Sequence, residues 1–169
     1  MAEKDVSIER LKELLRYEPE TGKLYWIAGH CRKIRPGAEA GKSGTNYLKV
    51  AVDKTQLKVH RVAWVLAHGR WPPHYLDHID GNRKNNILSN LREATRSENG
   101  QNQRRPSRRN KCGSLGVSYH NNPAAKNPWI AQIAINGEKK YLGSFATEAD
   151  ASKAYLAAKV ELHPFQTIV

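Results

Sequence analysis

The chain has 169 residues, with 28 Lys and Arg against 16 Asp and Glu, so its net charge is +12. Its longest apolar run, Val62–Ala67, is far short of the ~20 residues that a membrane span requires, and the charged N-terminus predicts no secretory signal. The cysteines, Cys31 and Cys112, form no CxxC pair, so we expect a reducing compartment, the cytoplasm, and no structural zinc. A basic protein of this kind most commonly binds nucleic acid.

The positive charge is concentrated in the middle of the chain. Residues 1–100 carry a net charge of +6, residues 101–111 carry +5 and residues 112–169 carry +1. Because the middle segment, QNQRRPSRRNK, has no acidic residue and no apolar core residue, it predicts a basic linker at 104–112 between domains at 1–103 and 113–169. Two interpretations stay open: a solvated tether, or a strap that becomes ordered on phosphates. In the second interpretation the contacts come from Arg104, Arg105, Arg108 and Arg109.

The N-terminal domain has an α+β pattern. In chain order we predict a helix capped by Ser7, a strand at 23–27, a hairpin at 47–52 and 56–60, and a helix at 61–68 that Gly69 ends. The stretch between the first strand and the hairpin is rich in glycine and is predicted to be loop.

A strand, loop, strand and helix follow between residues 75 and 103. Residues 75–79 predict a strand that ends at the Asp80-Gly81 turn, and residues 91–94 predict a second strand. Thr95 and Glu98 have the spacing of a capping box, T-x-x-E, which predicts that the helix begins there.

Polar residues recur through this segment in a specific order. Asp77-His78 is followed by Asn90 and then by Asn99, and the flanking text includes DGN, NN and SEN. The constellation resembles the HNH nuclease motif, and it is most similar to the phage and intron homing endonucleases. The resemblance covers residues 1 to about 103 and implies a ββα-metal fold.

The resemblance implies a role for each residue of the motif. His78 is expected to be the general base that deprotonates water, and Asn90 to orient His78 through its amide. Asp77 and Asn99 are expected to hold one divalent ion, Mg²⁺ or alternatively Mn²⁺. Taken singly, each of these residues has an ordinary structural role as an alternative, such as a turn for Asp77 or Asn90.

Other residues near the motif are candidates for support and for phosphate contacts. His60 is expected to support the site rather than to catalyse. The basic residues expected to contact DNA are Arg61, Arg83, Lys84 and Arg96, although solvated surface charges have the same appearance in a sequence.

The C-terminal domain predicts three antiparallel strands and one helix. The strands are expected at 117–120, 128–134 and 139–142, with an Asn136-Gly137 turn, and the helix follows Thr147. Residues 113–165 resemble the ethylene-response-factor (ERF) type DNA-binding domain of plant transcription factors, which is also found appended to phage HNH nucleases.

Alternation along these strands divides their side chains between two faces. The face on the helix is expected to contain Val117, Tyr119, Trp129, Ala131, Ile133 and Leu142. The face toward DNA is expected to contain Ser118, His120, Gln132, Lys139 and Tyr141. The plant domains carry arginines where this chain has Ser118 and Ala134, so guanine readout of the plant kind is not expected.

Together these expectations describe a site-selective DNA endonuclease of the phage homing type. It is expected to act on double-stranded DNA as a monomer or weak dimer, to nick one strand per active site, and to work in a bacterial or phage-infected cell. One alternative is a DNA-binding regulatory protein with an inactive HNH scaffold. A weaker alternative is an RNA-binding protein, which no aromatic RNP-type motif supports.

Overall fold

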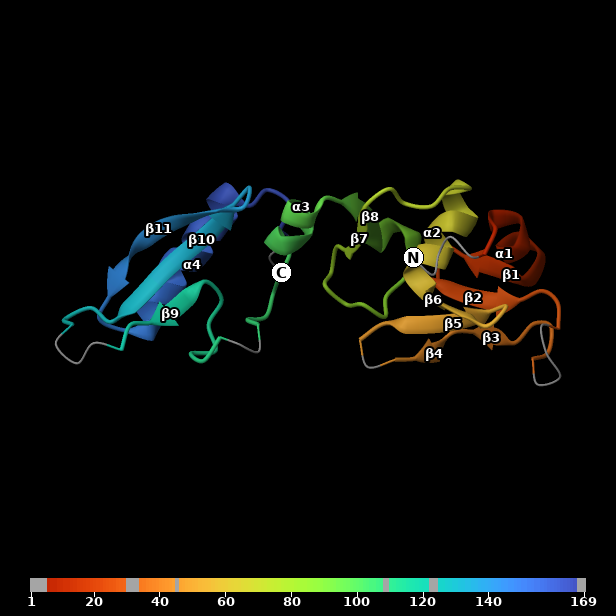
Figure 1. Cartoon of the computed structure of the whole chain (residues 1–169), viewed down its shortest axis with the longest axis horizontal. Helices are drawn as coiled ribbons and strands as arrows, with labels where there is room; N and C mark the ends of the chain where they lie inside the picture. The colour runs from red at the N-terminus through yellow and green to blue at the C-terminus, as the bar shows by residue number, and fades with distance from the viewer. Residues whose placement is uncertain (1–5, 30–33, 45, 108–109, 122–124, 167–169) are drawn as a thin grey trace. The chain divides into compact units, whose positions relative to one another are not determined.

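The computed structural model describes residues 6–29, 34–44, 46–107, 110–121 and 125–166 (Figure 1). The chain divides into two compact units, Met1–Ala94 and Thr95–Val169, each of mixed α/β structure with small antiparallel sheets.

The first unit begins with α1 (Ile8–Leu14), whose N-cap is Ser7 as predicted: its side chain accepts a hydrogen bond from the Arg10 amide at 3.1 Å. A three-stranded antiparallel sheet follows, consisting of β1 (Leu15–Glu18), β2 (Lys23–Trp26) and β3 (Glu39–Ala40). The strand β1 was not predicted, because it follows the helix without any turn residue between them.

A second antiparallel sheet contains β4 (Lys42–Ser43), β5 (Leu48–Val52) and β6 (Thr55–Lys58). Two residues, Asp53 and Lys54, connect β5 to β6 with positive φ angles of 45° and 68°, the backbone of a type I′ hairpin turn. The predicted hairpin is therefore confirmed. Short strands β3 and β4 lie where the sequence predicted loop only.

The helix α2 (Val59–His68) lies against both of these sheets and contributes to one buried core. Gly69 ends it as predicted, with a left-handed φ of 68° and an amide that donates to the Val65 carbonyl at 2.8 Å. Val62 and Val65 are fully buried in this core with Leu11 and Val52.

Two further strands, β7 (Tyr75–His78) and β8 (Leu91–Ala94), form an antiparallel pair. The loop between them contains the short 3₁₀ helix η2 (Leu88–Asn90). Next along the chain comes α3 (Arg96–Gln101), and Thr95 and Glu98 form the predicted capping box at its start. The predicted order of strand, loop, strand and helix is thus confirmed, while its metal-binding arrangement stays a prediction.

The second unit contains a three-stranded antiparallel sheet with α4 (Glu148–Leu162) along one face (Figure 1). The sheet order is β11 (Glu138–Phe145), β10 (Trp129–Ile135), β9 (Val117–Tyr119). Asn136 and Gly137 make the predicted turn with φ angles of 52° and 92°. The expectation for Tyr119 is wrong: this side chain is 53% exposed, because it ends β9 and packs edge-on against Trp129 instead of under the helix.

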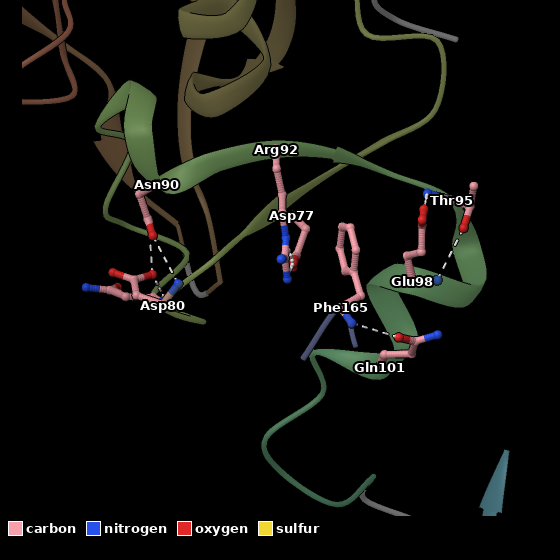
Figure 2. A network of polar contacts seen from close by, with 9 residues as sticks. Asp77, Asp80, Asn90, Arg92, Thr95, Glu98, Gln101 and Phe165 are labelled. Carbon is pink, nitrogen blue, oxygen red and sulfur yellow. Dashed lines mark hydrogen bonds and ion pairs between the residues drawn. The ribbon is translucent and has the colours of Figure 1, made fainter. Parts of the chain in front are cut away.

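The helix α3 belongs to the second unit. The amide of Phe165 donates to Oε1 of Gln101 at 3.2 Å (Figure 2). Nζ of Lys159 donates to the Gln103 carbonyl at 2.6 Å. The boundary between the compact units therefore lies earlier in the chain than the predicted domain boundary at residue 103. Where the functional domains end stays a prediction.

Candidate active site

Two adjacent residues at the end of β7, Asp77 and His78, are both buried, with 8% and 4% of their surface exposed. Adjacent side chains of a strand point to opposite faces, so each of the two has its own set of partners. Burial of two ionisable side chains at the end of one short strand is uncommon unless each is paired or hydrogen-bonded.

Asp77 is paired with Arg92, the residue directly across from it on β8. The guanidinium donates to Oδ2 of Asp77 from Nη2 at 2.9 Å and from Nε at 3.1 Å (Figure 2). Asp77 and Arg92 are direct cross-strand neighbours. Assigning the register of the predicted strands at 75–79 and 91–94 would therefore have identified this ion pair from the sequence.

His78 has a buried hydrogen-bond partner in Asn86. Nε2 of His78 lies 3.0 Å from Oδ1 of Asn86, and Nδ2 of Asn86 donates to the Lys84 carbonyl at 3.4 Å. An amide oxygen can only accept, so neutral His78 carries its proton on Nε2 and its lone pair on Nδ1. The loop between the strands therefore selects one tautomer of the expected general base.

Asn86 is itself held by the β1–β2 hairpin. Its side chain is only 2% exposed, and its backbone carbonyl accepts a hydrogen bond from the Tyr17 hydroxyl at 2.8 Å. The turn residue Gly22 has a positive φ of 71°, and a Cβ there would overlap the backbone of Asn86 and Ile87. The first sheet thus fixes the residue that orients His78.

Two more rings pack around His78. The His60 ring lies 5.0 Å from the His78 ring, edge-on at 72°, and the Tyr47 ring lies 5.0 Å from His60 and 6.1 Å from His78. Burial lowers the pKa of His60 from 6.5 to about 3, and burial also lowers the pKa of His78. Both imidazoles are therefore neutral at neutral pH, the form that a general base requires.

Asn90 does not have the predicted contact with His78. Its Oδ1 accepts from the Asp80 amide at 3.0 Å, and its Nδ2 donates to Oδ1 of Asp80 at 2.9 Å and to the Asn85 carbonyl at 2.8 Å (Figure 2). The prediction that the Asn90 amide orients His78 is wrong, because Asn90 ends η2 with its side chain toward the turn at Asp80. Asn90 closes the loop, and Asn86 orients the histidine.

The remaining predicted residues have varied surroundings. Arg61 donates from Nη1 to the His74 carbonyl at 3.0 Å and from Nη2 to the Pro72 carbonyl at 3.3 Å, so it braces the segment before β7. The exposed residues are Arg83, Lys84, Arg96, Asn99, Arg104, Arg105, Ser118, His120, Lys139 and Tyr141, and Gln132 is partly exposed. Arg108 and Arg109 lie outside the described residues.

The donor chemistry at Asp77 and Asn99 is suited to a hard cation, since carboxylate and amide oxygens are the ligands that Mg²⁺ prefers. Asp77 lies in the first unit and Asn99 on α3 in the second, so a joint site stays a prediction. Within the described ranges, no three His, Cys, Asp or Glu side chains gather where they could hold a metal ion. Two protein oxygens would leave most of the coordination to phosphate and water.

Residues 57–101 match the family model described as HNH endonuclease. Over 124 residues, 72% of its length, the chain is 34% identical to a protein of Acanthamoeba polyphaga mimivirus named Uncharacterized HNH endonuclease L560. Over 81 residues, 47% of its length, it is 35% identical to Protein 3.8 of Escherichia phage T7. The aligned parts span 60% and 64% of those relatives, about three fifths of their length. No solved structure matches the chain.

The family match coincides with the candidate site. It begins at Leu57 in β6, ends at Gln101 in α3, and contains Asp77, His78 and Asn90. The matched range does not extend to the sheet of the second unit, so the ERF-type assignment stays a prediction. No helix in the described part of the chain is long and apolar enough to span a membrane.

Proposed function

We propose that this chain is a DNA endonuclease of the phage homing type, which hydrolyses one phosphodiester bond per active site. The observation that carries the proposal is the buried His78, whose proton Asn86 holds on Nε2, within a segment that matches the HNH endonuclease family. Nδ1 of this neutral imidazole is the atom that accepts a proton from the attacking water.

Asp77 and Asn99 would hold one divalent ion, Mg²⁺ or Mn²⁺, which when bound neutralises charge that develops on the phosphate oxygens. Asn90 keeps the loop between β7 and β8 closed, so that Asn86 stays against His78. His60 packs on His78 and shields it from bulk water, which is a supporting role.

The second unit supplies DNA binding in this proposal. Its sheet exposes Ser118, Lys139 and Tyr141, with Gln132 partly exposed, and His120 is exposed directly after β9. Strands of this size can lie in a major groove. The chain would act on double-stranded DNA as a monomer or weak dimer in the cytoplasm of an infected host, and a double-strand break would need two sites.

One contact favours a second candidate function. Arg92 donates twice to the Asp77 carboxylate. Its guanidinium therefore occupies the oxygen that is expected to bind a metal cation. If Arg92 keeps a metal ion off Asp77, the chain is a DNA-binding regulatory protein that retains an inactive HNH scaffold.

Nicking of supercoiled plasmid decides between the two. We expect wild type to convert plasmid to open circles with Mg²⁺ or Mn²⁺, and a chelator to abolish this. Because His78→Ala removes the base, we expect it to slow nicking by ~10²- to ~10⁴-fold.

The matched control is His74→Ala, since His74 is exposed and its side chain has no hydrogen bond or ion pair within the part of the chain that the structure describes. It should nick at the wild-type rate. Plasmid left intact with either metal, together with tight DNA binding, would establish the regulatory function instead. Equal cutting by wild type and His78→Ala would show that another group is the base.

A further inference from the structure

Three lysines lie directly opposite one another across the sheet of β4, β5 and β6. Lys42 is the cross-strand partner of Lys49, and Lys49 is the partner of Lys58. All three are exposed, while Val50 and Leu57 of the same strands are buried on the other face. We call these three residues the lysine row.

By itself, the lysine row lowers the stability of the folded protein. Like charges directly opposite on neighbouring strands repel and destabilise the sheet. Among the residues that the structure describes, no ion pair involves Lys42, Lys49 or Lys58. A row of cations that form no ion pair within the described residues is the arrangement expected of a surface that binds a polyanion.

Tyr47 lies between Lys58 of the lysine row and His78 of the candidate active site. Nζ of Lys58 lies 5.0 Å from the centroid of the Tyr47 ring, and the Arg83 guanidinium carbon lies 5.1 Å from the same centroid. The Tyr47 ring is 6.1 Å from the ring of His78. One aromatic ring therefore holds two exposed cations beside the expected general base.

We propose that the lysine row and Arg83 bind the sugar-phosphate backbone of the DNA strand that His78 attacks, with Tyr47 as the residue that positions Lys58 and Arg83. This inference rests on the proposed function for the identity of its ligand. Neighbouring strands are ~4.8 Å apart, so the row spans ~10 Å, a length of duplex axis that carries about six phosphate charges.

The proposed surface positions DNA without reading its sequence. Lysine ammonium groups act on phosphates as point charges, and phosphate contacts carry no base information. Arg83 was expected from the sequence to contact DNA, but neither Tyr47 nor any residue of the row was, because the row exists only in the register of three paired strands.

The test measures binding of the full chain to a 30-base-pair duplex by fluorescence anisotropy, with a chelator present so that no cutting occurs. The double variant Lys49→Gln, Lys58→Gln should bind more weakly, and the slope of log K against log salt should fall by ~1.8, which is ~0.9 for each lost phosphate contact. The control is Lys12→Gln, Lys153→Gln, which removes the same charge from exposed positions on α1 and α4 and should keep the wild-type slope.

Tyr47 is tested by a pair of variants. Tyr47→Phe keeps the ring and should bind DNA like wild type, whereas Tyr47→Leu should lower the salt slope.

The thermal unfolding midpoint of Lys49→Gln, Lys58→Gln should stay level or rise, because the substitutions remove a repulsion, so weaker binding cannot be attributed to misfolding.

An unchanged salt slope in the double variant, or a wild-type chain that does not bind the duplex, would overturn the inference. These results are distinct from those that bear on the proposed function. If wild type nicks plasmid but the double variant keeps the wild-type salt slope, the chain is a nuclease whose lysine row does not bind DNA. A chain that never nicks but loses slope in the double variant has the surface without the nuclease activity.

Discussion

At the scale of single residues, the chemistry proposed for this protein depends on which nitrogen of His78 carries the proton. Asn86 presents an amide oxygen to Nε2 at 3.0 Å, so Nδ1 keeps the lone pair. Without that acceptor, the ring could rotate or change tautomer and would present its lone pair to water for only part of the time. Asn86 is therefore a positioning residue, which acts on water only through His78.

Replacing Asn86 tests this role. Asn86→Leu keeps the buried volume but removes the acceptor, and we expect it to lower the single-turnover rate of plasmid nicking by ~10- to ~100-fold, the usual cost of losing a partner that orients a functional histidine. The KM for DNA should not change, since Asn86 is buried and does not face a ligand. Asn86→Asp keeps an acceptor oxygen and should recover most of the rate. A wild-type rate in Asn86→Leu would contradict the assignment.

His60 makes a separate prediction about stability and pH. Its pKa is about 3 in the folded protein and 6.5 ordinarily, so between those pH values the unfolded chain binds a proton that the folded chain does not. Stability should therefore fall as pH drops below 6.5, by at most ~1.4 kcal/mol per pH unit from this group, and should not depend on it above 6.5.

Urea unfolding of wild type and His60→Phe from pH 7.5 to pH 5 measures this contribution. The phenylalanine variant keeps a ring against His78 and cannot titrate, so its stability should decline less steeply below pH 6.5. If the two proteins lose stability in parallel, His60 is not the group responsible.

At the scale of elements, local signals were sufficient to predict where most helices and hairpins begin and end. Ser7, Thr95 and Thr147 each accept a hydrogen bond from an amide three residues later, a contact that the sequence contains in full. The turn at Asn136-Gly137 is equally local, because its backbone needs residues that tolerate positive φ. These elements depend on neighbours in the chain and not on the rest of the fold.

Elements and contacts that depend on distant partners were not predictable in this way. The strand β3 contains two residues and exists because it pairs with β2 across a long loop. The lysine row needs the register of three strands, and the position of Asn86 needs Tyr17, which is 69 residues away in the sequence. No short pattern encodes such pairings, so sequence reasoning identified His78 but not the residue that orients it.

At the scale of the whole molecule, the charge is distributed unevenly among the parts. The first hundred residues carry a net charge of +6, residues 101–111 carry +5, and the remainder, with the β9–β11 sheet, carries +1. A nearly neutral binding face gains little from phosphate attraction, so the β9–β11 sheet with α4 should bind DNA only modestly without residues 101–111. The first unit and residues 101–111 (the connector) would supply most of the attraction that does not depend on sequence.

The connector has two possible roles: it is either a solvated tether, or a strap that becomes ordered when its arginines contact DNA phosphates. Its start is fixed within the second unit, because Nζ of Lys159 donates to the Gln103 carbonyl at 2.6 Å and the side-chain Nε2 of Gln103 donates to the Arg105 carbonyl at 2.8 Å. Its end is fixed as well, since Nδ2 of Asn110 donates to the Ser114 carbonyl at 2.6 Å. Ends held in this way lower the entropy cost of ordering the segment on DNA, which favours the strap.

Neutralising the connector tests the strap directly. Replacing Arg104, Arg105, Arg108 and Arg109 together by Gln should lower the slope of log K against log salt by up to ~3.6, because each arginine that contacts a phosphate contributes ~0.9. Replacement of the same four by Lys keeps the charge and should keep most of the slope. A slope that does not change in the Gln variant would show that the segment is only a tether. In that case the lysine row and Arg83 would account for more of the salt dependence. If instead both surfaces contact phosphates at the same time, combining the Gln variant with Lys49→Gln, Lys58→Gln should give additive losses of slope.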